Sequence, residues 1–340
     1  MYSFLNDYSE GAHENILRAL IETNHESTVG YGLDEYTKEA INLILNELKM
    51  DADIHFASGG TQANILVISH LLRPYEAIIA CDSGHINTHE AGSIESRGHK
   101  ILTIKNVNGK ITIDDIKKIL SKHQNEHMVK PKLVYISNAT EIGTSYTKEE
   151  LEALYRFTKV NDLYLFIDGA RLSNVLCNGD LTLADVARNC DVFYFGGTKN
   201  GALFGEAIIF TNKLLAKDFR YTMKQNGSIL AKGRILGIQF KELFKDRLYL
   251  KLAKRANDLA RIISDELIDL NVKLLTKTNT NQIFPVLDNI VIEKLKEKYL
   301  FEIWEDYDEL SKVVRFVTSW DTKKEAVDAL LEDLKIIYAK

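Results

Sequence analysis

Cysteine and proline are scarce in this sequence, and their scarcity excludes several kinds of protein. The 340 residues include three cysteines, Cys81, Cys177 and Cys190. An odd and sparse set has neither the pattern of a disulfide framework nor the spacing of a zinc site, so we expect reduced thiols in a cytoplasmic protein. With three prolines and no low-complexity stretch, the sequence offers no linker between independent domains.

Long apolar runs and an excess of positive charge are also lacking. The N-terminal residues have neither the basic nor the apolar region of a signal peptide, and apolar runs such as residues 77–81 are too short to span a bilayer. The formal net charge is -5, and no stretch concentrates lysine and arginine without acidic residues among them. We therefore expect neither a nucleic acid nor a membrane as a partner.

What the sequence does contain is an alternation of amphipathic helices with short, nearly continuous apolar runs. Such runs are typical of strands buried on both faces, so the pattern predicts an α/β fold with a mostly parallel sheet between layers of helices. The predicted helices include residues 35–48, 61–72, 112–122 and 147–161. The predicted strands include residues 53–57, 77–81, 100–104, 132–137, 164–168, 191–196 and 206–210.

The order of elements changes from about residue 249. A long charged helix, predicted at 249–270, is followed by predicted strands at 282–287, 301–304 and 312–319 and a helix at 289–299. Thr322 and Glu325 predict a capping box at the start of the last helix. The sequence therefore predicts a large domain over residues 1–248, N-terminal segment included, and a smaller α+β domain over residues 249–340.

A short glycine motif follows the predicted strand 53–57. Gly59 and Gly60 let a ligand approach the backbone, and the helix that begins at Thr61 offers free N–H groups and the positive end of its dipole. These features suit a phosphate group. The alternative is a tight strand–helix turn that Thr61 caps.

An aspartate ends the predicted strand 164–168, at the sheet edge where α/β proteins bind ligands. Burial of an unpaired carboxylate is costly, so Asp168 requires a cationic partner. Arg171 is one candidate, and a protonated pyridine nitrogen is another. A purely structural Asp–Arg pair remains the alternative.

A lysine follows the predicted strand 191–196 after two glycines. Most lysines are solvated, but Lys199 comes at the end of a core strand, among small residues and close to Phe204. Burial lowers the pKa of a lysine, and a neutral amine can form an imine with an aldehyde.

Two histidines follow the predicted strand 77–81. His85 and His89 have the spacing of residues on one helix face, but no third metal ligand is evident, and His123 with His127 repeats the spacing in a polar stretch. We therefore expect no metal, and interpret His85 as a flat ring that stacks on a heteroaromatic ligand.

An arginine interrupts an apolar face in the predicted strand 312–319. Arg315 shares its face with Val313 and Val317. A guanidinium there is suited to grip a carboxylate through two parallel hydrogen bonds. An edge-strand arginine that reaches solvent remains the alternative.

The order of these motifs is more informative than any one of them. A phosphate site, a stacking ring, a carboxylate for a ring nitrogen, an imine-forming lysine and an arginine for a carboxylate are the parts of an enzyme that uses pyridoxal 5'-phosphate (PLP) on amino acids.

The same segments resemble the low-specificity L-threonine aldolases, members of the β-eliminating lyase group of fold-type I PLP enzymes. The resemblance covers nearly the whole chain in the same order. It rests on Ser58-Gly59-Gly60-Thr61-Gln62-Ala63-Asn64, His85 with Glu90-Ala91-Gly92, Asp168-Gly169-Ala170-Arg171, Thr198-Lys199 and Val314-Arg315-Phe316-Val317-Thr318.

The resemblance implies a role for each cofactor residue. Residues 59–61 bind the phosphate of PLP, and His85 stacks on its ring. Asp168 keeps the ring nitrogen protonated, and Lys199 forms the Schiff base.

The resemblance also implies how substrate and subunits are arranged. Arg171, Arg315 and Asn6 meet the substrate carboxylate. The active site lies between the subunits of a homodimer or homotetramer. Lys224 and Lys232 fall in the region that supplies basic residues to the phosphate site of the neighbouring subunit.

The sequence departs from the family in one stretch. Family members often have a histidine in an Asn-Thr-His-Asn run that helps to handle the substrate hydroxyl. Here the run reads Ser137-Asn138-Ala139-Thr140-Glu141, so that Thr140 or Glu141 stands in place of the histidine. We expect an altered side-chain pocket, with Thr140 and Glu90 among the substrate-binding residues.

The expected reaction is cleavage of the Cα–Cβ bond of L-threonine or L-allo-threonine to glycine and acetaldehyde. For the base that takes the hydroxyl proton, His85, Glu90 and His89 acting through water stay open. Other PLP reactions (β-elimination, racemisation or transamination) use the same cofactor residues. A scaffold without turnover and a phosphate- or nucleotide-binding protein are further alternatives, although neither glycine motif has the Walker spacing.

Overall fold

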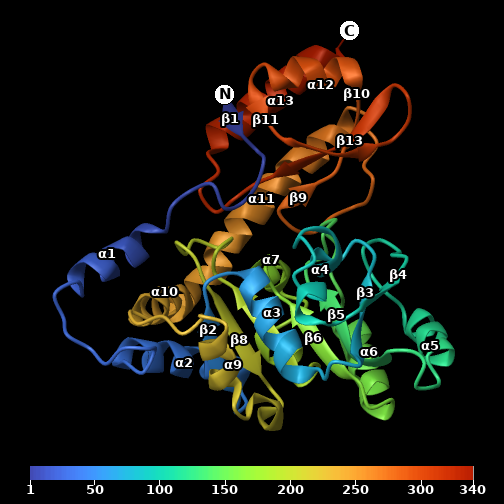
Figure 1. Ribbon diagram of the computed structural model, residues 1–340. Helices are drawn as coiled ribbons and strands as arrows, with labels where there is room; N and C mark the ends of the chain where they lie inside the picture. Colours follow the sequence, from blue (N-terminus) through green and yellow to red (C-terminus); the bar gives the residue numbers. More distant parts are fainter. Residues whose placement is uncertain (340) are drawn as a thin grey trace.

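A seven-stranded sheet forms the centre of the large part of the molecule (Figure 1). The computed structural model describes residues 1–339. The strands are β2 (Asp53–Ala57), β3 (Glu76–Cys81), β4 (Ile101–Ile104), β5 (Lys130–Ser137), β6 (Tyr164–Asp168), β7 (Val192–Gly196) and β8 (Glu206–Phe210), in the order β2-β8-β7-β6-β5-β3-β4. Strand β8 is antiparallel to both neighbours and the other pairs are parallel, so the predicted mostly parallel α/β sheet is confirmed.

Helices cover both faces of this sheet. They are α2 (Glu35–Leu48), α3 (Gly60–Leu71), α4 (His85–Thr88), α5 (Ile113–Lys122), α6 (Lys148–Val160), α7 (Leu172–Leu176), α8 (Leu183–Arg188), α9 (Phe219–Gln225) and α10 (Arg234–Phe244), with 3-10 turns at Glu95–Arg97, Lys213–Ala216 and Lys245–Arg247. Within β6, Leu165 and Ile167 join one apolar cluster while Phe166 joins the other. Successive strand residues face opposite ways, so the sheet separates two cores, and its strands are therefore continuous apolar runs.

The C-terminal part is a smaller layered unit. It consists of α11 (Leu248–Asp269), β9 (Gln282–Ile283), β10 (Val286–Asp288), α12 (Asn289–Lys296), β11 (Tyr299–Leu300), β12 (Glu302–Asp306), β13 (Ser311–Val317) and α13 (Lys324–Tyr338). Strand β13 pairs antiparallel with β9, β10 and β12. The predicted capping box is wrong: the N-cap of α13 is Lys323, and Thr322 instead accepts a hydrogen bond from the backbone N–H of Ser319 (2.7 Å).

The N-terminal segment packs on this C-terminal part. Strand β1 (Tyr2–Ser3) pairs parallel with β11, and the fully buried Phe4 belongs to the C-terminal apolar cluster. The chain then crosses to α1 (Glu14–Glu22), beside α10. The sequence prediction had placed these first residues in the large domain. The pairing of β1 with β11 joins residues almost a whole chain length apart, so it leaves no local signal in the sequence.

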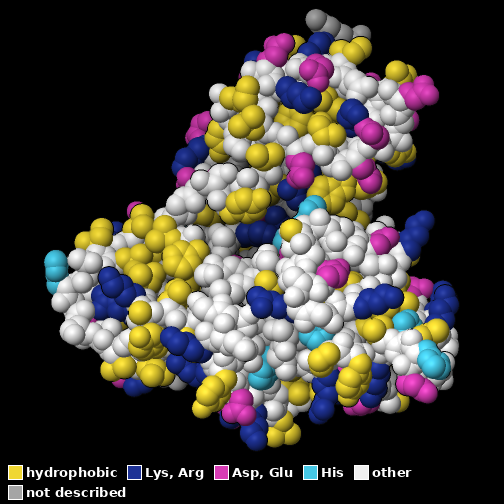
Figure 2. Space-filling model, viewed as in Figure 1, with side chains coloured by type: hydrophobic (Ala, Val, Ile, Leu, Met, Phe, Trp, Pro, Cys, Tyr) yellow, Lys and Arg dark blue, Asp and Glu magenta, His cyan; other side chains and the backbone are white. Residues whose placement is uncertain are grey.

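The arrangement leaves a hollow between the two parts of the molecule, visible in Figure 2. The parallel strands β5 and β6 end side by side, at Ser137 and Asp168, because these residues are in register. No helix in the described part of the chain is long and apolar enough to cross a membrane.

Candidate active site

A cavity of about 280 Å³ lies at the carboxyl ends of the central strands. It brings together seven of the residues singled out from the sequence: Gly59, Gly60, Thr61, His85, Asp168, Arg171 and Lys199. The rest of its wall combines residues of the quoted sequence motifs, Glu141 included, with three that the sequence did not single out: Ser58, Ser137, Ala139, Glu141, Ala170 and Thr198 belong to the motifs, and Tyr8, Tyr194 and Glu206 are new.

Asp168 lies at the floor of this cavity and is 4 % exposed. The hydroxyl of Tyr135 donates to Oδ2 (2.6 Å), as does Nδ2 of Asn64 (3.3 Å). The hydroxyl of Tyr194 and the backbone N–H of Ala170 donate to Oδ1. These donors fix the carboxylate where strand β6 ends, in the position predicted for the partner of a ring nitrogen.

The two tyrosines were not predicted from the sequence, although a signal for them exists. Tyr135 and Tyr194 each lie between apolar neighbours in strands β5 and β7, and a buried phenol requires a hydrogen-bond partner. Burial, followed by the charge of Asp168, raises the pKa of both phenols well above the ordinary range. They therefore remain neutral donors.

Lys199 lines the same cavity and has no ion-pair partner among residues 1–339. Burial and the positive charge of Arg171 lower the pKa of its amine, while Asp7, Asp168 and Glu206 act in the opposite direction. The ammonium lies 5.9 Å from the ring centre of Tyr8. This is the environment in which a lysine becomes a nucleophile.

Glu206, the first residue of β8, lines the same cavity as Lys199. It accepts hydrogen bonds from the hydroxyl of Thr198 (2.8 Å) and the backbone N–H of Gly197 (3.2 Å). Burial raises the pKa of Glu206 to about 8, with the Thr198 hydrogen bond and the Lys199 charge acting against this. The buried carboxyl group therefore holds its proton more tightly than an ordinary glutamate does.

The glycine motif forms an open cradle at the start of α3. Gly59 is the N-cap, and no side chain caps the free N–H groups of the first turn. A Cβ atom at Gly60 would lie 2.9 Å from the hydroxyl of Tyr194, so only glycine leaves the cradle open. Because an uncapped helix N-terminus favours an anion, the cradle, Lys199 and Asp168 fit PLP as a group with phosphate, aldehyde and ring nitrogen.

His85 begins α4 and is oriented by a buried carboxylate. Its Nδ1 lies 2.8 Å from Oε1 of Glu90, which also accepts from Asn64 (2.8 Å), while Oε2 accepts from Ser93 (2.7 Å). Glu90 does not line the cavity. Its hydrogen bonds show that it holds the imidazole in place, whereas sequence analysis placed it among the substrate-binding residues.

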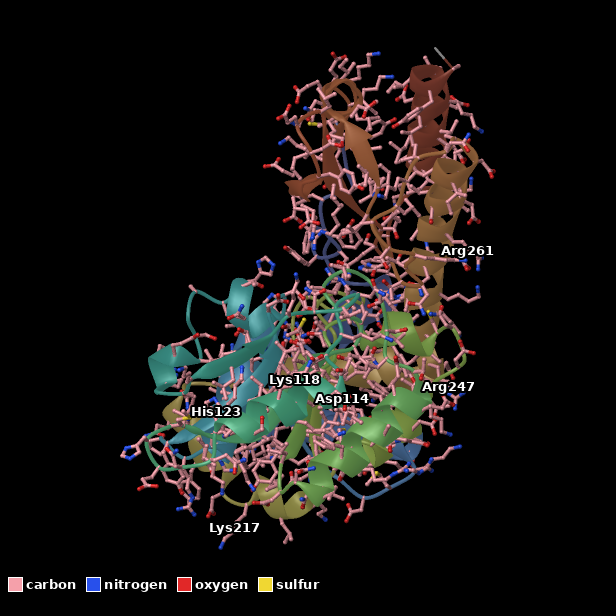
Figure 3. The ribbon with its side chains drawn as sticks, turned by 90° about the vertical axis from the view of Figure 1, so that its right-hand side faces the viewer. Asp114, Lys118, His123, Lys217, Arg247 and Arg261 are labelled. Carbon is pink, nitrogen blue, oxygen red and sulfur yellow. The ribbon has the colours of Figure 1, made fainter. Side chains whose placement is uncertain are left out.

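No group of three or more His, Cys, Asp or Glu side chains suited to a metal occurs in the part of the chain that the structure describes. The rings of His85 and His89 are 5.5 Å apart. His123 lies in the large part, away from the C-terminal part (Figure 3), and its Nδ1 is 2.8 Å from the carbonyl oxygen of Val129.

Arg171 is bound to an N-terminal carboxylate rather than to Asp168. Its Nε and Nη2 donate to Asp7 (2.7 and 2.9 Å), so that Nη1 has no partner among the described side chains. Oδ1 of Asn6 accepts hydrogen bonds from Tyr8 and Ser9, and Asn6 does not line the cavity.

Arg315 lies outside the cavity wall. It forms an ion pair with Glu302 and lies 5.2 Å from the ring centre of Trp304. Burial and the positive charge of Arg171 lower the pKa of Arg315, so the charge of one guanidinium group affects the other. Buried Nε of Arg315 has no hydrogen-bond partner among residues 1–339.

Thr140 and Glu141 face different surroundings. Thr140 is 1 % exposed and its hydroxyl bonds to that of Thr144 (2.7 Å), away from the cavity. Glu141 lines the cavity instead. The stretch that departs from the family pattern therefore presents a carboxylate, whereas sequence analysis placed Thr140 among the substrate-binding residues.

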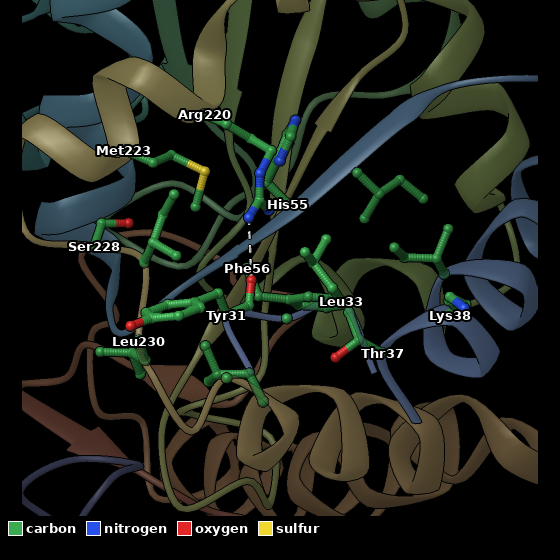
Figure 4. Close-up of a pocket in the computed structure, with 16 residues that line it drawn as sticks. Tyr31, Leu33, Thr37, Lys38, His55, Phe56, Arg220, Met223, Ser228 and Leu230 are labelled. Carbon is green, nitrogen blue, oxygen red and sulfur yellow. Dashed lines mark hydrogen bonds between the residues drawn. The ribbon is translucent and has the colours of Figure 1, made fainter. Parts of the chain in front are cut away.

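Lys224 and Lys232 are exposed and do not line this cavity. Lys224 lies over the ring of Tyr31. Tyr31 in turn lines a second, apolar cavity of about 270 Å³ (Figure 4). There Arg220 donates to the backbone oxygen of Tyr31 (3.2 Å). This second cavity contains neither Lys199 nor Asp168.

Comparison with known proteins gives consistent matches. The family described as beta-eliminating lyase matches residues 4–290. Low-specificity L-threonine aldolases of Pseudomonas sp. and Pseudomonas aeruginosa are each 34% identical, over 98% of this chain and 97% of theirs. A solved threonine aldolase of Leishmania major is 44% identical with a TM-score of 0.98, covering 99% of this chain and 100% of that one. An aspartate aminotransferase of Thermus thermophilus, 14% identical with a TM-score of 0.72, shares the fold. The chain belongs to the beta-eliminating lyase family.

Proposed function

We propose that this protein is a PLP-dependent lyase that cleaves the Cα–Cβ bond of L-threonine or L-allo-threonine to glycine and acetaldehyde. The observation that carries the proposal is the presence of Lys199 and Asp168 in one cavity, in a chain 34% identical to curated low-specificity L-threonine aldolases. β-Elimination, racemisation and transamination use the same cofactor residues, but no feature of the site favours them.

The cofactor residues divide the work of holding PLP. When bound, PLP supplies an electrophilic aldehyde and a cationic ring that accepts the electron pair of the broken bond. Lys199 would hold the aldehyde, Asp168 would keep a proton on the ring nitrogen, and the cradle at residues 59–61 would bind the phosphate. His85, fixed by Glu90, would cover a face of the ring.

The substrate carboxylate would meet Arg171 at the cavity wall and Arg315 from outside it. Arg171 lines the cavity and keeps Nη1 free while Asp7 holds its other edge. Arg315 would turn from Glu302 toward the same carboxylate, since its Nε has no partner among the described residues. Asn6 would be a third contact of the substrate carboxylate, because it precedes Asp7 in the same loop.

We also propose that the enzyme is a homodimer or homotetramer in the cytoplasm. Exposed apolar side chains gather on α1 and the segment after it: Leu17, Ile21, Val29, Tyr31 and Leu33. Large apolar side chains left exposed in one segment of the chain support association. Lys224 and Lys232, outside this chain's cavity, would complete the phosphate site of the neighbouring subunit, and the three free cysteines are compatible with a reducing compartment.

The test is a product assay with matched substrates. Purified protein with PLP is incubated with L-threonine, L-allo-threonine, L-serine and L-alanine, and aldehyde, ammonia and keto acid are measured. Release of acetaldehyde with an equal amount of glycine is the expected result. Ammonia or keto acid without acetaldehyde would contradict the proposal and identify one of the other PLP reactions.

A further inference from the structure

The carboxyl groups in and around the cavity differ in how their oxygens are bonded. Four of them have both oxygens bonded to protein donors: Asp7, Glu90, Asp168 and Glu206. In Glu141, Oε1 accepts from the backbone N–H of His85 (2.9 Å) and from the hydroxyl of Ser137 (2.6 Å). Oε2 of Glu141 has no hydrogen-bond partner among residues 1–339. It is not one of the buried side-chain atoms that lack a partner, so it is not sealed off from the cavity.

We propose that Glu141 takes the proton of the substrate's β-hydroxyl group during Cα–Cβ cleavage, and so makes the site selective for β-hydroxy amino acids. The proposal rests on the lyase function proposed above and adds a residue to it. Its basis is positional: Glu141 lines the cavity with Lys199, and it keeps one oxygen free.

The proposed step is balanced in protons and electrons. The Glu141 carboxylate takes the hydroxyl proton, and the O–H electron pair becomes the second carbon–oxygen bond of acetaldehyde. The electron pair of the Cα–Cβ bond stays with the glycine Cα, where bound PLP would supply the stabilisation. Cα then takes up one proton and glycine results, so the reaction consumes no oxidant and no net proton.

The surroundings of Glu141 suit a group that both accepts and returns a proton. Burial raises its pKa, the Ser137 hydroxyl lowers it in part, and the charge of Asp168 raises it further. A base works best when its pKa approaches the operating pH. The titratable groups that interact with it are Cys81, Tyr135, Tyr146, Asp168 and Arg171, beside the backbone contact to His85.

His85 is the competing proton acceptor in the cavity. Its Nδ1 is held by Glu90, and its ring is assigned to stacking on the cofactor. The two residues are separable by substitution. Glu141→Gln keeps an oxygen for the His85 N–H and the Ser137 hydroxyl but accepts no proton, whereas His85→Phe keeps a flat ring and removes the imidazole.

The experiment compares two reactions at one site. Threonine cleavage requires the hydroxyl proton to leave, whereas exchange of the glycine α-proton in D2O, followed by NMR, does not. In Glu141→Gln we expect kcat for cleavage to fall about 10²–10³-fold, with KM and glycine exchange within about threefold of wild type. Glu126→Gln, an exposed loop substitution, changes neither reaction. His85→Phe keeps more cleavage activity than Glu141→Gln.

A measurement without turnover completes the test. Infrared difference spectra of the cofactor-free protein over a pH series should show a carboxyl group that ionises to the carboxylate above the ordinary pH range of glutamate, and this transition should be missing from Glu141→Gln. Identical spectra contradict the proposal. So does a Glu141→Gln variant that cleaves like wild type, or one that loses glycine exchange together with cleavage. If wild type exchanges the glycine α-proton but releases no aldehyde, the lyase function itself is wrong and the role of Glu141 falls with it.

Discussion

Asp7 and Arg171 form a two-point ion pair that joins the N-terminal segment to the floor of the cavity. Nε and Nη2 of Arg171 donate to the two oxygens of Asp7 at 2.7 and 2.9 Å, and Nδ2 of Asn281 donates to the same carboxylate at 2.9 Å. The side chain of Asp7 is fully buried. One pair therefore ties together the N-terminus, the loop after β6 and the C-terminal part.

Removing the charge of Asp7 should destabilise the protein strongly. Asp7→Asn leaves the guanidinium of Arg171 buried without its counter-charge, and breaking a buried pair in this way costs about 3–5 kcal/mol. The free energy of unfolding is measured by urea denaturation of the cofactor-free protein. Asp51→Asn is the matched control, because Asp51 pairs with Lys213 at the surface and its loss should cost less than about 1 kcal/mol. Equal losses in the two variants would refute the assignment.

The same pair predicts a dependence of stability on pH. Burial alone would raise the pKa of Asp7, but Arg171, Lys199 and the Asn281 hydrogen bond bring it below the ordinary value of 3.8. The stabilisation is thus fully present above the unfolded pKa and is lost as pH falls through the folded pKa. Urea midpoints from about pH 6 to about pH 3 should show the difference between wild type and Asp7→Asn shrinking in acid. A stability difference that grows in acid would contradict the lowered pKa of Asp7.

Tyr135 and Tyr194 should each stabilise the protein through Asp168. Tyr135→Phe and Tyr194→Phe each remove a hydroxyl donor from a buried carboxylate, which costs about 1–3 kcal/mol. Tyr75→Phe serves as control because Tyr75 is 57% exposed. The quantity compared is the free energy of unfolding without cofactor. If the buried substitutions cost no more than the control, these phenols do not support Asp168.

Gly169 in the Asp-Gly-Ala-Arg run is required by backbone packing. A Cβ atom at this position would lie 1.9 Å from the carbonyl oxygen of Tyr194, which is backbone and cannot swing aside. Gly169→Ala should cost at least about 2 kcal/mol of stability. Gly11→Ala, with nothing within 4 Å of the added carbon, should leave the unfolding midpoint nearly unchanged. A Gly169→Ala protein as stable as wild type would contradict the prediction, because the backbone at Tyr194 would then have moved aside at little cost.

Local pattern was sufficient to predict much of the fold. The strands Asp53–Ala57, Tyr164–Asp168 and Glu206–Phe210 and the helix Glu35–Leu48 have the predicted bounds, because burial and end-capping act on neighbouring residues. Pairing of β1 with β11 was not predictable, since it joins opposite ends of the chain.

The site was predictable where a motif ends a strand, as at Asp168 and Lys199. Partners brought by other segments of the chain were not, as Tyr135 and Glu206 in other strands and Asp7 in the N-terminal segment illustrate. Which of Thr140 and Glu141 faces the cavity depends on the path of the loop after β5. A loop has no repeating sequence pattern from which this path could be predicted.

Reduction of the purified protein by borohydride, followed by peptide mass spectrometry, tests the central claim most directly. The account predicts that wild type shows an absorption band near the visible edge that borohydride abolishes, with the reduced cofactor fixed to the peptide that contains Lys199. Lys199→Ala should show neither the band nor the modified peptide. A cofactor fixed to another lysine, or no fixed cofactor in protein saturated with PLP, would contradict the account.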